Sequence, residues 1–174
     1  MRAATAAEDA EVRAFFEALE KGLASRVLAG HALAVVVRDG IQFAALVTPE
    51  VLARVPDAVR DGADAVGLPI GVMQSGAFHL DLQGAVLASR HTKAGTLRVT
   101  DHAARLFLYG RNVLGDSVLW ADPALRKGEP CIVADPRGDA MGIGVVVGSF
   151  KGPREAVLAV HDLGTYLRDQ DEGD

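Results

Sequence analysis

The sequence predicts an α+β protein, in which an N-terminal α/β domain with antiparallel strands is followed by a small C-terminal β barrel. The chain has 174 residues, of which 49% are apolar, so it can bury a hydrophobic core. The first half alternates helical and strand patterns, whereas the second half carries short strands separated by frequent turns. We therefore predict domains at 1–92 and 93–170, with 171–174 as a disordered acidic tail.

A helix is predicted over the first 24 residues. Thr5 and Glu8 have the spacing of a capping box, in which each side chain satisfies a backbone donor of the first turn. Apolar residues that recur at helical spacing form one face of this helix: Val12, Phe15, Phe16, Leu19 and Leu23.

A hairpin is predicted next, from apolar runs at Ala32–Arg38 and Ile41–Val47. Asp39 and Gly40 separate them, and this pair readily adopts the positive φ angles of a two-residue turn. Both strands are therefore expected to be adjacent and antiparallel.

Shorter elements complete the N-terminal half. A helix is expected from Pro49 to about Val55, since proline is favoured at the first helical position. The pattern over 57–67 is only weakly helical. Leu68–Met73 and Ala77–Leu82 predict a second strand pair, and Ala85–Ala88 a short helix.

The C-terminal half begins with a strand, helix and turn in the stretch Leu97 to Trp120. Leu97 and Val99 form the strand, Thr100 or Asp101 caps the helix, and Gly110 permits a tight bend. A second strand is expected at 118–120.

Further strands are predicted at Cys131–Ala134, Met141–Val147 and Ala156–Val160, each preceded by a turn signal. Asp162 is expected to begin a last short helix that ends near Arg168. The glycines of Met141-Gly142-Ile143-Gly144 lie within a strand pattern, which favours a bulge or a close backbone approach over a dinucleotide loop.

The sequence contains few signals for catalysis. Cys131 is the only cysteine and lies in an apolar run, so it is expected to be a buried thiol in a reducing cytoplasm. The histidines lack metal-ligand spacing, and no nucleophile elbow or phosphate loop is present, so neither metal nor cofactor is expected. No leader or membrane span is apparent.

Positive charge is concentrated in the C-terminal half, although the net charge of the chain is −5. Residues 93–168 carry ten Lys or Arg against eight Asp or Glu. Each cation alone is explained by solvation, but together they are compatible with phosphate binding. Arg111 and Asn112 add groups that can meet base edges or 2′-hydroxyls. The cations that flank the predicted elements are Arg98, Arg105, Arg111, Lys151, Arg154 and Arg168.

The stretch Leu97 to Leu114, with its Phe-Leu-Tyr-Gly and Val-Leu motifs, and the run Gly142 to Val146 resemble a PUA domain. With the ending Asp-Leu-Gly-x-Tyr-Leu-Arg at 162–168, the chain more narrowly resembles the Nip-seven family of large-subunit ribosome-assembly factors, archaeal type. This resemblance implies an N-terminal α/β domain joined to a C-terminal PUA-like β pseudo-barrel, without catalytic activity.

The resemblance also implies a function and a site. Family members bind uridine-rich or AU-rich single-stranded RNA through the PUA domain and take part in pre-rRNA processing and large-subunit assembly. The matching basic positions here are Lys151, Arg154 and Arg168, with Arg111 and Asn112 nearby in the motif loop. Acidic residues lie among them, so RNA affinity is expected to be low or to require a protein partner.

The expected protein is thus a monomeric RNA-binding factor that contacts pre-rRNA and other assembly or exosome-associated proteins. An adaptor that docks protein partners and contacts RNA secondarily is an alternative. An RNA-modifying enzyme or its accessory is a further alternative, less favoured because no nucleophile motif, zinc ligands or cofactor loop is seen.

Overall fold

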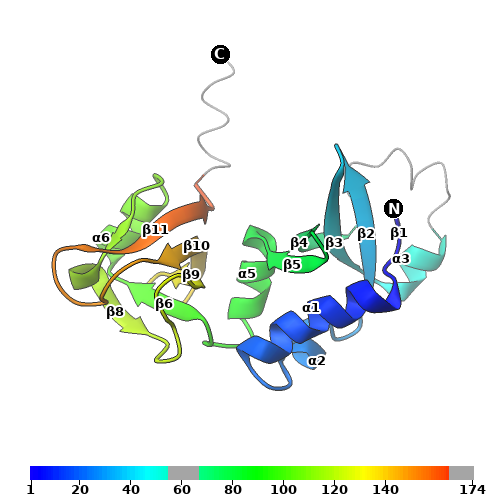
Figure 1. Ribbon diagram of the computed structural model, residues 1–174, viewed down its shortest axis with the longest axis horizontal. Helices are drawn as coiled ribbons and strands as arrows, with labels where there is room; N and C mark the ends of the chain where they lie inside the picture. The colour runs from blue at the N-terminus through cyan, green and yellow to red at the C-terminus, as the bar shows by residue number, and fades with distance from the viewer. Residues whose placement is uncertain (55–66, 165–174) are drawn as a thin grey trace, which may run out of the picture. The chain divides into compact units, whose positions relative to one another are not determined.

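The computed structural model describes residues 1–54 and 67–164, which form two compact units, Met1–His91 and Thr92–Asp174 (Figure 1). The predicted helical pattern over 57–66, the end of the last predicted helix and the acidic tail at 171–174 lie outside the described residues. None of the helices within the described ranges is both long and apolar enough to span a membrane.

Two helices, rather than one, occupy the start of the N-terminal unit. Helix α1 (Ala6–Leu19) begins with the predicted capping box, in which the Glu8 N–H donates to Thr5 Oγ1 at 3.3 Å and the Thr5 N–H donates to Glu8 Oε2 at 2.8 Å. The single helix predicted over 24 residues is wrong, because the backbone becomes extended at Glu20, with a φ of −158°, and Gly22 with a left-handed φ of 79° precedes a second helix. Helix α2 (Leu23–Val27) follows.

The N-terminal sheet has five antiparallel strands in the order β1-β2-β3-β4-β5. The predicted hairpin is confirmed, and Asp39 and Gly40 form its turn with φ angles of 50° and 78°. The strands are β1 (Arg2–Ala3), β2 (Ala32–Arg38), β3 (Ile41–Val47), β4 (Leu68–Gln74) and β5 (Ala77–Leu80).

Helices and aromatic side chains complete the N-terminal unit. Helix α3 (Pro49–Arg54) begins at the predicted proline. Helix α5 (Leu82–Ser89) begins at Leu82, which the sequence placed in a strand, because Asp81 Oδ1 accepts the Gln83 N–H at 2.8 Å and caps the helix. The rings of Phe15 and Phe78 lie 5.1 Å apart and join α1 to β5.

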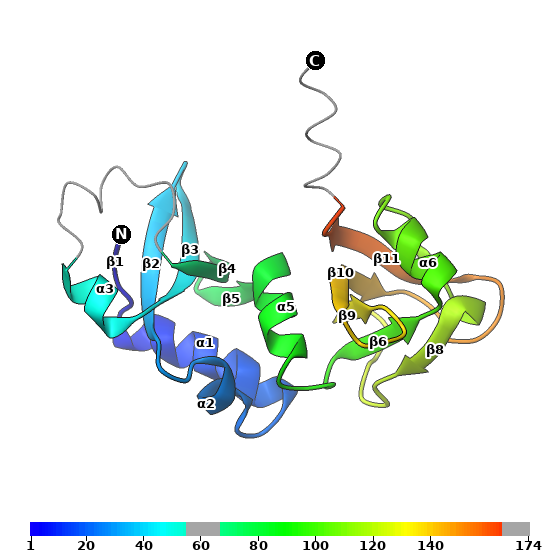
Figure 2. The same cartoon turned by 180° about the vertical axis from the view of Figure 1, so that it is seen from behind.

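A curled, six-stranded half-barrel forms the C-terminal unit (Figure 2). Its strand order is β7-β11-β10-β9-β6-β8, with β6 and β9 parallel and the other pairs antiparallel. The strands are β6 (Thr96–Val99), β7 (Val113–Leu114), β8 (Val118–Ala121), β9 (Pro130–Ala134), β10 (Ala140–Val146) and β11 (Glu155–Asp162).

Helix α6 (Asp101–Phe107) and the 3₁₀ turn Gly115–Ser117 connect these strands. Phe107 is fully buried in a core that it shares with Val113, Val133 and Val157. The α+β fold predicted from the sequence is therefore confirmed. It places an antiparallel sheet in the N-terminal unit and a half-barrel in the C-terminal unit.

Strand β10 passes close to β11, as its glycines predict. The register between β10 and β11 shifts between Ile143 and Gly144, which marks a bulge. Strand β11 is longer than predicted. Asp162 is its buried last residue and is paired with Gly142, so the prediction that Asp162 begins a helix is wrong.

Candidate nucleic-acid interface

The turn after helix α6 is held firmly by backbone and core contacts. Thr100 Oγ1 accepts the Ala103 N–H at 3.3 Å and caps the start of the helix. At the other end, the Arg111 N–H donates to the Leu106 carbonyl at 3.1 Å, and Gly110 takes a left-handed φ of 73°. The chain therefore reverses direction within a few residues and leaves Arg111 exposed.

Asn112 fixes this turn to strand β11. Its Oδ1 accepts the Ala159 N–H at 3.0 Å, and its Nδ2 donates to Glu155 Oε1 at 2.8 Å. The sequence predicted that the Asn112 side chain contacts RNA. In the structure, both its oxygen and its nitrogen form hydrogen bonds within the domain. Its position makes it a support for Arg111 and leaves one amide hydrogen for a ligand.

A second turn lies beside the other end of β7. The Gly115 N–H donates to the Arg154 carbonyl at 2.9 Å, and the Gly152 N–H donates to Asp116 Oδ1 at 2.7 Å. These bonds join the 3₁₀ turn to the loop between β10 and β11. Lys151 and Arg154 are exposed on that loop.

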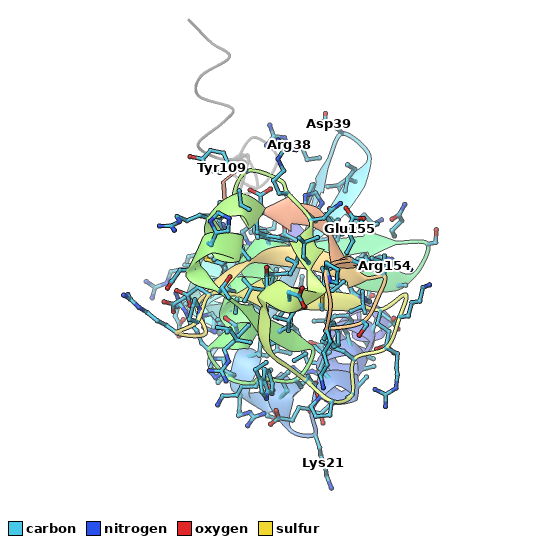
Figure 3. The ribbon with its side chains drawn as sticks, turned by 90° about the vertical axis from the view of Figure 1, so that its left-hand side faces the viewer. Lys21, Arg38, Asp39, Tyr109, Arg154 and Glu155 are labelled. Carbon is cyan, nitrogen blue, oxygen red and sulfur yellow. The ribbon has the colours of Figure 1, made fainter. Side chains whose placement is uncertain are left out.

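We call the strand β7, with the turns at 108–112 and 149–154, the β7 edge. Strand β7 is one of the two edge strands of the half-barrel and pairs with β11 through Leu114 and Glu155. Arg154 immediately precedes β11 and lies five positions before Ala159, which is about 16 Å of extended chain at about 3.3 Å per residue. Figure 3 looks onto the C-terminal unit and labels Tyr109, Arg154 and Glu155.

The predicted cations on the β7 edge have no ion-pair partner within the part of the chain that the structure describes. Arg111, Lys151 and Arg154 form no ion pair with another described residue, whereas Arg2 and Arg13 are paired with carboxylates. Their charges are therefore available to an anionic ligand. The edge thus contains four of the five predicted site residues, namely these three cations and Asn112, while Arg168 lies outside the described residues.

Two acidic residues reduce the positive potential of the β7 edge. Glu155 accepts the Asn112 amide, and Asp116 accepts the Gly152 N–H. Both carboxylates are held near the cations in exposed positions, where solvent weakens but does not abolish their charge.

Another predicted cation, Arg98, has a different environment. Its guanidinium carbon lies 5.3 Å from the centre of the Trp120 ring, across the paired strands β6 and β8. The guanidinium group of Arg98, which the sequence placed among the candidate phosphate-binding groups, is therefore engaged in a cation–π contact within the domain. Arg98 lies on β6, which is next to the edge strand β8, whereas β7 is the edge strand at the other end of the sheet.

Tyr109 was not among the residues that the sequence predicted to contact RNA. It lies in the turn after α6 with its side chain 72% exposed. Its neighbour in the same motif, Phe107, is fully buried. The helical phase around Phe107 could have indicated this difference, because a residue two positions away on a helix faces a different direction.

Cys131 is buried, as predicted. Its Sγ lies 3.5 Å from the Gly144 carbonyl, to which it donates, and burial raises the pKa of the thiol to about 12. Among the described residues, no three His, Cys, Asp or Glu side chains are grouped to hold a metal ion.

Residues 95–171 match the family model described as UPF0113 PUA domain. The C-terminal domain is a PUA domain. The curled sheet and helix α6 described above belong to this match, and so does the whole β7 edge. PUA domains generally bind RNA, so the match supports an RNA-binding role.

The fold is similar to three solved archaeal structures. A hypothetical protein from Pyrococcus horikoshii OT3 has a TM-score of 0.68 and 14% identity, with 92% of this chain and 93% of that chain covered. A conserved PUA domain protein from Thermoplasma acidophilum has a TM-score of 0.61 and 16% identity, with 97% of both chains covered.

The third structure is a PUA domain from Aeropyrum pernix K1 in complex with tartrate. It has a TM-score of 0.54 and 16% identity, with 98% of this chain and 90% of that chain covered. No curated protein sequence matches the chain. At these identities the structures establish a shared fold for nearly the whole chain.

Proposed function

We propose that the protein is a non-enzymatic RNA-binding factor of the Nip-seven type that acts in pre-rRNA processing and assembly of the large ribosomal subunit. Its PUA domain binds single-stranded, uridine-rich RNA, and the protein acts as a cytoplasmic monomer of the archaeal type with other assembly proteins. The observation that carries the proposal is the set of exposed cations on the β7 edge, which form no ion pair within residues 1–54 and 67–164.

The chemistry of these cations suits a phosphate backbone. Arg111 and Arg154 present planar guanidinium groups that can donate two parallel hydrogen bonds to one phosphate, and Lys151 adds a compact charge. Asn112 of one turn bonds both Glu155 and Ala159 of β11, and Arg154 of the other turn immediately precedes β11, so one extended RNA strand can reach both turns. A single strand also leaves base edges free for recognition.

Glu155 and Asp116 limit the affinity that this edge provides. Their negative charges oppose a polyanion that approaches the cations, so binding by the isolated protein is expected to be modest. A basic protein partner that covers these carboxylates would remove the opposition. This is the physical basis for proposing that the factor works within an assembly complex.

Binding of a fluorescent uridine oligomer, followed by anisotropy at about 50 to 200 mM salt, tests the RNA-binding proposal. Three phosphate contacts predict that log affinity falls with log salt at a slope of about −2, since each contact on a single strand contributes about −0.7. Folded protein that fails to bind at the lowest salt would overturn the proposal.

Charge-removing variants locate the surface. Arg111→Gln and Arg154→Gln are each expected to weaken binding and to reduce the salt slope by about 0.7. Arg137→Gln is the matched control, because Arg137 is also exposed but lies in the turn between β9 and β10. Equal losses for all three variants would show that binding is not localised to the β7 edge.

The role in subunit assembly requires a separate experiment. In extracts of the source cells, the protein is expected to sediment with precursors of the large subunit and to leave them when Arg111 and Arg154 are both replaced by Gln. Retention of the double variant on the precursors after nuclease treatment would instead favour the protein adaptor.

A non-enzymatic role is tested by mass analysis of the bound RNA. The nucleosides are expected to be unchanged, and a new modified nucleoside would contradict this role.

A further inference from the structure

Tyr109 has the most exposed side chain among the large apolar residues that the structure describes. Its exposed fraction is 72%, compared with 59% for Val37 and 58% for Leu119. The ring makes no contact with another ring among the described residues. Most of this aromatic residue is thus left to solvent, which is costly unless a ligand uses the ring.

The backbone beneath Tyr109 is fixed on both sides. The Tyr109 N–H donates to the Leu106 carbonyl at 3.0 Å, and the Gly110 N–H donates to the Phe107 carbonyl at 2.9 Å. Phe107 anchors the preceding turn in the core, while Asn112 anchors the following residues to β11. The ring is therefore presented from a rigid base, which lowers the entropy lost on binding.

Two exposed cations flank Tyr109 in the sequence. Arg105 precedes Tyr109 by one helical turn and Arg111 follows it by two residues, and both side chains are exposed. Neither forms an ion pair with another described residue. From 102 to 115 the chain has no acidic residue.

An exposed aromatic ring with exposed arginines close to it in the sequence is an arrangement that suits single-stranded nucleic acid. A base stacks on the ring while the guanidinium groups neutralise the neighbouring phosphates. A protein partner would favour a broader apolar surface, whereas here only Leu106, at 41% exposure, adds apolar area within the turn and helix end. The cations favour an anionic ligand over an apolar one.

We propose that Tyr109 stacks on one unpaired base of the bound RNA, with Arg105 and Arg111 holding the phosphates on either side of that base. This inference rests on the proposed RNA-binding function and adds a base contact to it. Every base has a flat face, so the stack selects single strands over duplexes and does not select uridine. Selectivity for uridine must come from hydrogen bonds made elsewhere on the interface.

The contribution of stacking to affinity is distinguished from that of charge by comparing two ligands of equal length and charge, a uridine oligomer and an oligomer of abasic ribose phosphates. Tyr109→Ala is expected to weaken binding of the uridine oligomer roughly 5- to 100-fold. It should leave the abasic oligomer's affinity and both salt slopes unchanged, because it removes no charge. Tyr109→Phe keeps the ring and is expected to bind like the unmodified protein.

Arg111→Gln is the matched control, since it removes charge and keeps the ring. It is expected to weaken both oligomers and to lower the salt slope for both. Circular dichroism checks that each variant is folded, which is expected because the Tyr109 side chain is largely exposed.

The possible failures are distinguishable. If the unmodified protein binds uridine and Tyr109→Ala binds it equally well, stacking is refuted while the RNA-binding function stands. Equal losses of uridine and abasic binding in Tyr109→Ala would also refute stacking. If the unmodified protein binds neither oligomer, the proposed function itself fails.

Discussion

Glu8 shows how a single side chain joins two elements of the N-terminal unit. Arg2 Nη1 donates to Glu8 Oε2 at 2.7 Å and Arg2 Nη2 donates to Glu8 Oε1 at 2.6 Å, while the Thr5 N–H donates to the same carboxylate. The Arg2 hydrogen bonds, helped by those from Thr5, lower the pKa of Glu8 to about 2. Strand β1 is thereby tied to the start of α1.

This lowered pKa predicts how stability depends on acid. A carboxylate with a lowered pKa stabilises the native state above its ordinary pKa of about 4.3. That contribution is lost as the pH falls from there toward about 2. Urea unfolding across this pH range should show Glu8→Gln to be less stable at neutral pH and less sensitive to acid than the unmodified protein.

Glu11→Gln is the control for this experiment, because Glu11 lies on the same helix but makes none of these contacts. Its stability should follow that of the unmodified protein at every pH. Parallel profiles for Glu8→Gln and the unmodified protein would contradict the prediction.

The burial of Cys131 predicts a thiol without reactivity. Since burial raises its pKa to about 12, almost no thiolate is present near neutral pH, and access is blocked as well. A coloured disulfide reagent should therefore react slowly with native protein and rapidly with protein unfolded in guanidinium. Rapid reaction of the native thiol would show that strands β9 and β10 separate readily.

At the scale of elements, strand β10 depends on glycine at two positions. A Cβ added to Gly142 would lie 2.2 Å from the His161 carbonyl oxygen and 2.8 Å from the Cα of Asp162. A Cβ added to Gly144 would lie 2.7 Å from the Leu158 carbonyl oxygen. The backbones of β10 and β11 thus approach too closely for any side chain at these positions.

Gly142→Ala is accordingly expected to lower the free energy of unfolding by about 1 to 3 kcal/mol, the usual effect of overpacking. Urea titration measures this change. Leu119→Ala is the control, because its side chain is 58% exposed on edge strand β8 and its loss should change stability by less than about 0.5 kcal/mol. A Gly142→Ala protein as stable as the control would show that the two strands can move apart without cost.

At the scale of the whole molecule, the sequence correctly predicted the features that depend only on residues close together in the chain. The capping box of Thr5 and Glu8 and the turn at Asp39 and Gly40 act over a few residues, so local spacing was enough to predict them. The α6 cap at Thr100 belongs to the same class.

Features that join distant residues escaped prediction. Asn112 bonds to residues 43 and 47 positions away, so its supporting role could not be seen in its own motif. Arg98 appeared to be one more surface cation until the sheet placed Trp120 beside it. The exposure of Tyr109 likewise depends on which face of α6 is packed against the half-barrel core.

The two strand orders have a consequence for the path by which the chain folds. In the N-terminal sheet every strand pairs with its neighbour in sequence, whereas β7 pairs with β11 across most of the PUA domain. Contacts between distant residues form slowly because a long loop must first close. Pulse-labelled hydrogen exchange should therefore show the amides of β2 and β3 protected before those of β7 and β11, so the β7 edge is completed last.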